Sequence, residues 1–241
     1  MAVRKILLLS TSTIHGSEYL QYASSEIKSF LTESNVQTVL FIPYALHNHN
    51  AYFEKVKKAL LKMGFKTSSI HHACNPLSAV DKAEAIFIGG GNTFRLLKEL
   101  YDKNLLDIIK KRVLEDCIPY IGSSAGTNLA TVNICTTNDM PIVNPPSFSA
   151  LGFLPFNINP HYIDPDPNST HMGETREERI VQYHEIPSTP PVLGLREGSL
   201  LHIIGNTIIL KGNLKARLFV RGRVPKEINP GSDLSFLLSQ K

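Results

Sequence analysis

The chain has 241 residues, of which 42% are hydrophobic and 19% are charged, and this size predicts a single domain over residues 1–241. The formal net charge of +4 comes from scattered Lys and Arg, and no apolar run approaches the length of a membrane span, so we expect neither nucleic-acid nor membrane binding. The three cysteines form no C-x-x-C pair, which favours a reducing, cytoplasmic location over a secreted scaffold.

Apolar runs and helical spacings alternate through the first half of the chain. The predicted strands cover residues 5–10, 36–46, 66–70, 85–88 and 118–121. The predicted helices between them cover residues 18–31, 52–63, 92–101 and 105–114. This alternation predicts an α/β fold with a doubly wound, mostly parallel sheet and flanking helices.

The second half begins with a long loop over residues 136–160, rich in Pro, Asn, Ser and Gly. Residues 156–162 are predicted to form a strand that presents His161 at its end. A capping box starting at Thr175 predicts a helix to about residue 185, and residues 192–195 predict another strand. The remaining segment, to about Val220, is predicted to form a C-terminal region of antiparallel hairpins that turn at residues 205–206 and 211–213.

The frame Gly122-x-Ser124-x-Gly126 lies where a predicted strand passes into a helix. A turn this tight needs small residues on both sides of the serine, and it lifts the hydroxyl above the sheet edge as a nucleophile elbow. The same turn points the backbone N–H of Ala125 toward negative charge that develops beside the serine. The alternative interpretation is an ordinary loop of small residues.

Three glycines, from Gly89 to Gly91, follow the strand at residues 85–88. Their spacing matches neither a dinucleotide-binding loop nor a P-loop. We expect the backbone N–H groups of Gly90 and Gly91 to face the serine and to complete an oxyanion hole with Ala125. The alternative is a tight turn without a further role.

Ser124, His161 and Glu197 follow one another along the chain in the order nucleophile, base and acid, each at or just after the end of a predicted strand. A serine hydroxyl needs an imidazole to accept its proton, and the imidazole needs a carboxylate to fix its tautomer and stabilise its charge. A lone histidine is often structural, but the polar loop around His161 favours function. The three residues are therefore the predicted catalytic set.

Five ordered motifs resemble the peptidase E family of α-aspartyl dipeptidases, which are serine peptidases with a fold like that of class I glutamine amidotransferases. The motifs are GGGNTF at 89–94, GSSAG at 122–126, TTNDMP at 136–141, NINPH at 157–161 and GETR at 173–176. The resemblance implies hydrolysis of dipeptides with an N-terminal aspartate through an acyl-enzyme, with Ser124 as nucleophile and His161 as base. Glu197 matches the third position, while Asp139 could orient His161 or bind the substrate amino group.

Arg176 and Arg179 lie near the start of the capped helix, where they could read the carboxylate of a substrate aspartate. Arg179 is slightly favoured because it lies a turn inside the helix. The alternative is that both arginines pair with Glu177 and Glu178 in solvent.

Several other functions remain open at this point. A glutaminase of the amidotransferase type needs a cysteine where Ser124 stands, whereas a cyanophycinase-like hydrolase would cleave β-linked or polymeric aspartyl substrates. A non-enzymatic binding module is a further alternative. A metal site would use the histidines, but their spacing fits no ligand pattern, so we expect no metal and no cofactor. These histidines are His47, His49, His71 and His72. The expected partner is a small peptide, and the expected assembly is a monomer or homodimer.

Overall fold

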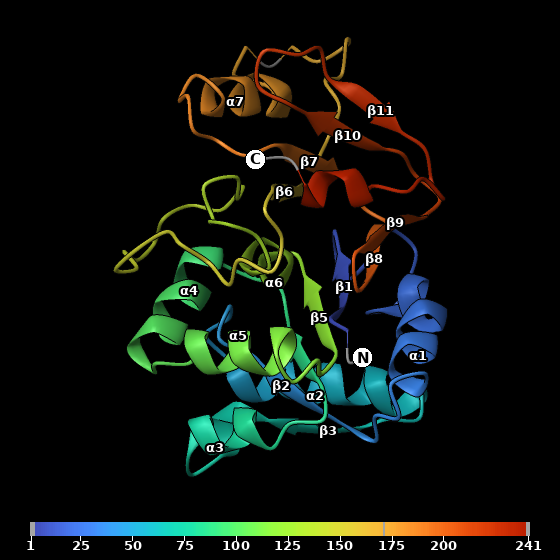
Figure 1. Ribbon diagram of the computed structural model, residues 1–241, viewed down its shortest axis with the longest axis vertical. Coiled ribbons are helices and arrows are strands. Elements are labelled where there is room, and N and C mark those ends of the chain that lie inside the picture. The colour runs from blue at the N-terminus through green and yellow to red at the C-terminus, as the bar shows by residue number, and fades with distance from the viewer. Residues whose placement is uncertain (1–2, 171, 240–241) are drawn as a thin grey trace.

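The computed structural model describes residues 3–170 and 172–239, and within these ranges the strands form a seven-stranded and a four-stranded sheet (Figure 1). The strands are β1 (Lys5–Leu9), β2 (Thr38–Ile42), β3 (Lys66–Ser69), β4 (Ile86–Ile88), β5 (Tyr120–Ser123), β6 (Asn157–Pro160), β7 (Val192–Leu195), β8 (Ser199–Ile204), β9 (Thr207–Gly212), β10 (Ala216–Phe219) and β11 (Lys226–Ile228). The α-helices are α1 (Ser24–Thr32), α2 (His49–Lys62), α3 (Pro76–Asp81), α4 (Thr93–Asp102), α5 (Leu106–Leu114), α6 (Ala125–Leu129) and α7 (Arg176–Tyr183). In the described part of the chain, none of the helices combines the length and hydrophobicity that spanning a bilayer requires.

The seven-stranded sheet has the order β3-β2-β4-β5-β1-β8-β9. Its first five strands are parallel, and β8 and β9 extend it with antiparallel pairs. In β1, Ile6 and Leu8 join the apolar cluster on the side of α3 to α6, whereas Leu7 and Leu9 join the cluster on the side of α1 and α2. Helices thus cover both faces of β1, and this explains its continuous apolar run.

The four-stranded sheet has the order β11-β10-β7-β6 and lies above the larger sheet in Figure 1. Strands β6 and β7 are parallel, and β10 and β11 add to them in antiparallel fashion. Helix α7 packs on this sheet through Ile180, which joins a small apolar cluster with Val192 and Phe219. The smaller sheet therefore positions the ends of β6 and β7 next to the end of β1, and α7 packs on this sheet.

The predicted fold class, a mostly parallel α/β sheet with flanking helices, is confirmed. The predicted capping box is also present, since the Thr175 side chain accepts from the backbone N–H of Glu178 and the Glu178 side chain accepts from the Thr175 backbone. Strand β2 is shorter than predicted: it ends at Ile42, immediately before Pro43, which has no N–H to donate to the sheet.

The predicted run of C-terminal hairpins is partly wrong. Strands β8 and β9 do form a hairpin around Gly205 and Asn206, but this hairpin belongs to the larger sheet because β8 pairs with β1. The turn predicted at residues 211–213 joins no hairpin, because β10 pairs with β7 and β11 in the other sheet. The short helix α3 and strand β11 were not predicted either.

Candidate active site

Ser124 lies between β5 and α6 with φ 54° and ψ −108°, a conformation that non-glycine residues rarely adopt. Its backbone N–H donates to the Leu9 carbonyl at 3.1 Å, so the turn is fixed to the end of β1. The flanking glycines are required by close approaches of the backbone. A Cβ on Gly122 would lie 2.5 Å from the Gly126 carbonyl oxygen, and a Cβ on Gly126 would lie 2.1 Å from that of Ile88.

His161 follows β6 and directs its imidazole at this turn. Its Nε2 atom lies 2.7 Å from Ser124 Oγ, and its Nδ1 atom lies 2.6 Å from Glu197 Oε1. With the ring proton on Nδ1 facing the carboxylate, Nε2 is left to accept the serine proton. The structure thus brings the three residues of the predicted catalytic set into one continuous hydrogen-bonded chain.

Ser10 holds the backbone of His161 in place and was missed by sequence reasoning. Its hydroxyl is buried at the end of β1, where it accepts from the backbone N–H of His161 at 2.9 Å and donates to the Leu195 carbonyl at 2.6 Å. One side chain therefore joins β1 to the residues that follow β6 and to the end of β7. The available signal was the polar turn at residues 10–13 directly after an apolar strand.

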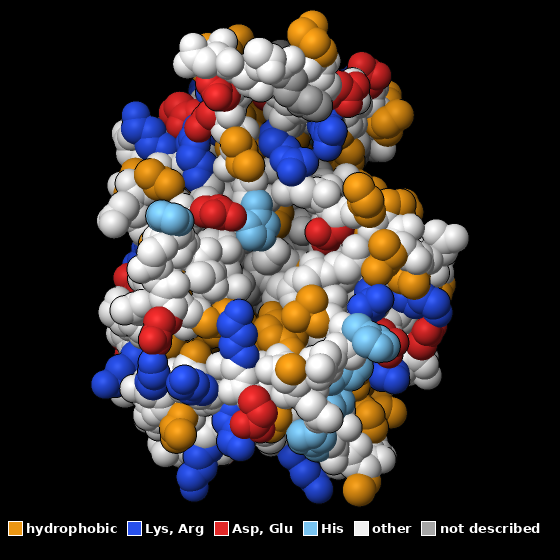
Figure 2. Space-filling model, turned by 180° about the vertical axis from the view of Figure 1, so that it is seen from behind, with side chains coloured by type: hydrophobic (Ala, Val, Ile, Leu, Met, Phe, Trp, Pro, Cys, Tyr) orange, Lys and Arg blue, Asp and Glu red, His pale blue; other side chains and the backbone are white. Residues whose placement is uncertain are grey.

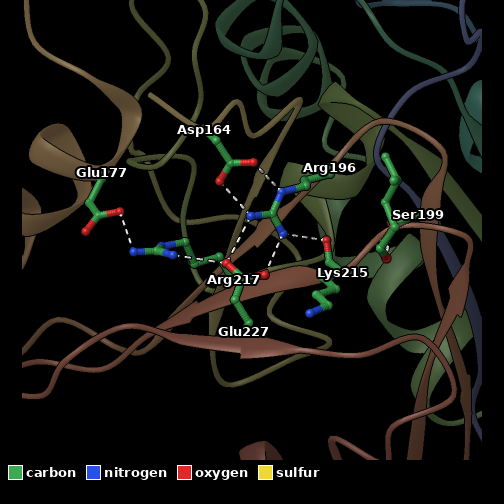
Figure 3. Close-up of polar contacts among 8 residues, drawn as sticks. Asp164, Glu177, Arg196, Ser199, Lys215, Arg217 and Glu227 are labelled. Atoms are coloured by element: carbon green, nitrogen blue, oxygen red, sulfur yellow. Dashed lines mark hydrogen bonds and ion pairs between the residues drawn. The ribbon is translucent and has the colours of Figure 1, made fainter. Parts of the chain in front are cut away.

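Arg196, the residue before Glu197, ties the Glu197 segment to the His161 segment (Figure 3). Its guanidinium donates to both carboxylate oxygens of Asp164, at 2.6 and 2.8 Å, and to Glu227 at 2.9 and 3.0 Å. These hydrogen bonds lower the pKa of Asp164 below its ordinary value of 3.8 and the pKa of Glu227 below 4.5. The Arg196 side chain is only 14% exposed, so this network fixes the backbone next to Glu197, the acid in the chain of hydrogen bonds with His161 and Ser124.

The same network reaches α7. Glu227 also accepts from Arg217 at 3.0 Å, and Arg217 pairs with Glu177 at 2.9 Å (Figure 3). Glu177 directly follows Arg176 in the first turn of α7. The start of α7, which carries both candidate arginines, is thereby fixed to the sheet that positions Glu197.

The three residues predicted to form an oxyanion hole differ in how their backbone N–H groups are used. The Gly90 backbone donates to the Tyr52 hydroxyl, and a Cβ on Gly90 would lie 2.9 Å from the Ser124 Cβ. Within the described residues, the N–H groups of Gly91 and Ala125 have no hydrogen-bond partner. Gly90 therefore leaves room for the serine, whereas Gly91 and Ala125 retain free donors.

A cleft of about 730 Å³ opens beside Ser124 and His161. Figure 2 shows a hollow in the middle of this face, with histidine and acidic side chains on its upper rim and hydrophobic and basic side chains on its lower rim. The other lining residues are Ser12, Tyr19, Leu46, His47, Asn48, Ala51, Tyr52, Lys55, Gly90, Gly91 and Asp139. The nucleophile thus faces a space large enough for a small peptide.

Asp139 lies at the edge of the cleft and also lines a smaller hollow of about 150 Å³. Its Oδ2 atom accepts from the backbone N–H and the hydroxyl of Thr93 at 2.7 and 2.6 Å, at the start of α4. Among the described contacts it makes no hydrogen bond to His161, whose Nδ1 is taken by Glu197. The structure therefore gives Glu197, and not Asp139, the position that orients His161.

Arg176 and Arg179 both line the smaller hollow. Asp139 lines this hollow and the cleft. Arg179 is exposed and lies 3.7 Å from a carboxylate oxygen of Glu174. Arg176 is half-buried and forms no ion pair with any residue the structure describes, and burial together with the charge of Arg179 lowers its pKa. The alternative, in which both arginines pair with Glu177 and Glu178, is not found among the described residues, since Glu177 pairs with Arg217 and Glu178 caps the helix.

Two of the four histidines considered as metal ligands are instead within hydrogen-bond distance of the same side-chain amide, that of Asn50. His71 and His72 each place Nε2 2.9 Å from Asn50 Oδ1, and His71 Nδ1 lies 2.6 Å from Ser69 Oγ. In the part of the chain that is described, no group of three or more potential ligands is arranged to hold a metal ion.

The sequence matches one protein-family model over residues 6–211, described as Peptidase family S51. A Drosophila melanogaster protein named "Probable alpha-aspartyl dipeptidase" is 48% identical over 242 residues, which cover 99% of each chain. "Peptidase E" of Streptomyces coelicolor is 50% identical over 233 residues, covering 97% of this chain and 94% of that protein. A solved structure from Listeria monocytogenes EGD-e, named as a peptidase E candidate, has a TM-score of 0.67 and 26% identity, covering 88% of this chain and 99% of that one.

Proposed function

This chain belongs to peptidase family S51, and from that premise we propose that it is a serine dipeptidase that hydrolyses dipeptides with an N-terminal aspartate. One observation carries the proposal: Ser124, His161 and Glu197 form an unbroken chain of hydrogen bonds at 2.7 and 2.6 Å on a strained strand-to-helix turn. The names of the two relatives support the aspartyl dipeptide as substrate.

In the proposed reaction, His161 Nε2 accepts the Ser124 proton while Oγ attacks the carbonyl carbon of the substrate aspartate. The carbonyl oxygen becomes negatively charged and takes hydrogen bonds from the free N–H groups of Gly91 and Ala125. His161 then returns the proton to the leaving amine, which departs as a free amino acid and leaves an acyl-enzyme. Water activated by His161 releases aspartate, and Glu197 stabilises the imidazolium in both steps.

Recognition of the aspartate side chain is assigned in this proposal to Arg176 ahead of Arg179. A half-buried guanidinium without an ion pair gains most from an incoming carboxylate, because the desolvation of the cation has already occurred. The Asp139 carboxylate lines both the smaller hollow and the cleft, and in this proposal it binds the substrate amino group.

A panel of dipeptides read by mass spectrometry tests this function. Asp-Leu should be cleaved, while Ala-Leu, Leu-Asp and Glu-Leu should be poor substrates, since one extra methylene displaces the glutamate carboxylate. Preferential cleavage of β-Asp-Leu would favour a cyanophycinase-like hydrolase. Failure to cleave any peptide, together with no reaction of Ser124 with a serine-directed phosphonate, would favour a binding module.

Three further expectations stay predictions: a single domain over residues 1–241, a cytoplasmic location, and a monomeric or homodimeric assembly. Sedimentation equilibrium of the purified chain measures the assembly directly. A stable trimer or larger species would contradict it. Limited proteolysis tests the domain prediction, which expects one protected fragment and not two.

A further inference from the structure

We propose that Lys55 forms the subsite for the free carboxylate at the C-terminus of the dipeptide, and that this contact restricts the enzyme to dipeptides. The inference rests on the proposed function and adds a determinant on the leaving-group side of Ser124. The observation behind it is that Lys55, which has no ion pair among the described residues, lines the cleft that contains Ser124 and His161.

Lys55 brings a positive charge to the lining of the cleft. Among the described residues that line it, Lys55 is the one Lys or Arg, and it forms no ion pair with another described residue. Other lysines of α2 are engaged, since Lys57 pairs with Glu54, and Lys62 pairs with Glu18. An anion entering the cleft therefore meets a lysine whose charge is still available.

Contacts between side chains place this ammonium on the α2 side of the nucleophile. The Lys55 Nζ atom lies 4.7 Å from the centroid of the Tyr19 ring, which holds it against the cleft wall as a cation–π contact. The Tyr19 hydroxyl donates to the Tyr52 hydroxyl at 3.4 Å, and Tyr52 in turn lies against Gly90 beside Ser124. Lys55 is thus linked to the nucleophile through two aromatic rings that line the same cleft.

The arrangement matches the charges of an aspartyl dipeptide. Its amino group and side-chain carboxylate belong to the residue that is acylated onto Ser124, and we assigned them to Asp139 and Arg176. Figure 1 shows α7, which carries Arg176, near the top of the view, and α2, which carries Lys55, in its lower half. In this proposal the C-terminal carboxylate, which belongs to the residue directly beyond the scissile bond, lies on the α2 side.

A longer peptide would lack this contact. Its second residue carries a neutral amide in place of the carboxylate, and the continuing chain would run into the wall formed by Tyr19 and Lys55. A flexible ammonium suits the task, because its four-carbon stem can follow leaving residues of different size. Leu46, whose side chain is 41% exposed at the cleft, provides an apolar contact for the side chain of that residue.

The test compares Asp-Leu with Asp-Leu amide, which lacks the terminal negative charge. The wild-type enzyme should have the higher kcat/KM on the free acid, and Lys55→Met should lower the ratio of the two kcat/KM values by about tenfold, the effect of one charge-assisted hydrogen bond. Lys57→Met is the matched control, since it removes a lysine from the same helix that is paired outside the cleft. This control should keep the wild-type ratio.

Each other outcome has a defined meaning. The inference is overturned if Lys55→Met keeps the wild-type ratio of the two kcat/KM values, or if the wild-type enzyme cleaves the free acid and the amide equally well. In either case, preferential cleavage of Asp-Leu over Ala-Leu still supports the proposed function. A wild-type protein that cleaves none of these peptides overturns both. Circular dichroism and the Tm of Lys55→Met, a substitution of an exposed side chain, show whether the variant is folded.

Discussion

The Nε2 atom of His161 lies 2.7 Å from the hydroxyl oxygen of Ser124, although the two residues follow strands of different sheets. Both have φ of 54°, so the chain holds nucleophile and base in backbone conformations that non-glycine residues rarely adopt. The Ser10 hydroxyl offsets part of this cost on the His161 side by accepting its backbone N–H. The proposed chemistry depends on this contact between the ends of two sheets.

Replacing Glu197 tests which acid orients the base. Glu197→Gln should lower kcat for Asp-Leu by about 10³–10⁴, because the imidazole of His161 loses the carboxylate that fixes its tautomer and stabilises its charge. The kcat and KM of the variant measure this effect.

Asp139→Asn is the control for this experiment, because Asp139 is hydrogen-bonded to Thr93 and not to His161. It should raise KM, because binding of the substrate amino group is weaker, and leave kcat nearly unchanged. If Asp139→Asn lost kcat by the larger factor and Glu197→Gln did not, the assignment of the two acids would have to be exchanged.

Arg176 and Arg179 can be separated by substrate selectivity. Arg176→Met should reduce kcat/KM for Asp-Leu by about 2–4 kcal/mol in activation free energy, with a much smaller effect on Ala-Leu. Arg179→Met should cost less than about 1 kcal/mol on either substrate, because its exposed side chain faces Glu174. Equal losses on both peptides in Arg176→Met would indicate that Arg176 supports α7 and does not read aspartate.

The network around Arg196 predicts a dependence of stability on pH. The folded-state pKa values of Asp164 and Glu227 lie below their ordinary values of 3.8 and 4.5, so their contribution is present above those values and is lost as the pH falls through the folded pKa values. Urea unfolding should therefore show that the free energy of unfolding decreases as the pH falls below about 4.5.

Arg196→Met should lower the free energy of unfolding at pH 7 by about 1–3 kcal/mol, because Asp164 loses its guanidinium partner and Glu227 keeps only Arg217. The variant should also flatten this pH dependence. Arg223→Met is the control: Arg223 is exposed and has no ion pair among the described residues, so stability should change by less than about 0.5 kcal/mol. An unchanged acid limb in Arg196→Met would show that the depressed pKa values have another cause.

Local patterns in the sequence predicted much of this fold. Apolar runs located the parallel strands, Thr175 and Glu178 identified the cap of α7, and two glycines around Ser124 identified the strained turn. Helix α3 was missed because six residues give too little periodicity, although Asn75 as the cap and Pro76 in the first turn were a readable signal.

Long-range pairing could not be predicted in the same way. Nothing local to β10 shows that it leaves the neighbouring hairpin for a second sheet, because that choice depends on the free edge of β7. The role of Ser10 depends on the strand order that puts β1 beside β5 and β8. Likewise, the partners of Arg196 lie 19 to 32 residues away along the chain, so that its function as an anchor could be seen only in the folded structure.

If Ser124 is the nucleophile of an aspartyl dipeptidase, hydrolysis of Asp-Leu should depend on Ser124 and not on its neighbour Ser123. The kcat/KM values for Asp-Leu in Ser124→Ala and Ser123→Ala measure this. Ser123 is the matched control, since its side chain is fully buried in β5 and its hydroxyl has no hydrogen-bond partner among the described residues. We expect Ser124→Ala to lose on the order of 10⁶ in rate while remaining folded, and Ser123→Ala to retain activity. Retention of more than about a tenth of wild-type activity by Ser124→Ala, with loss in Ser123→Ala, would contradict the assignment of the nucleophile.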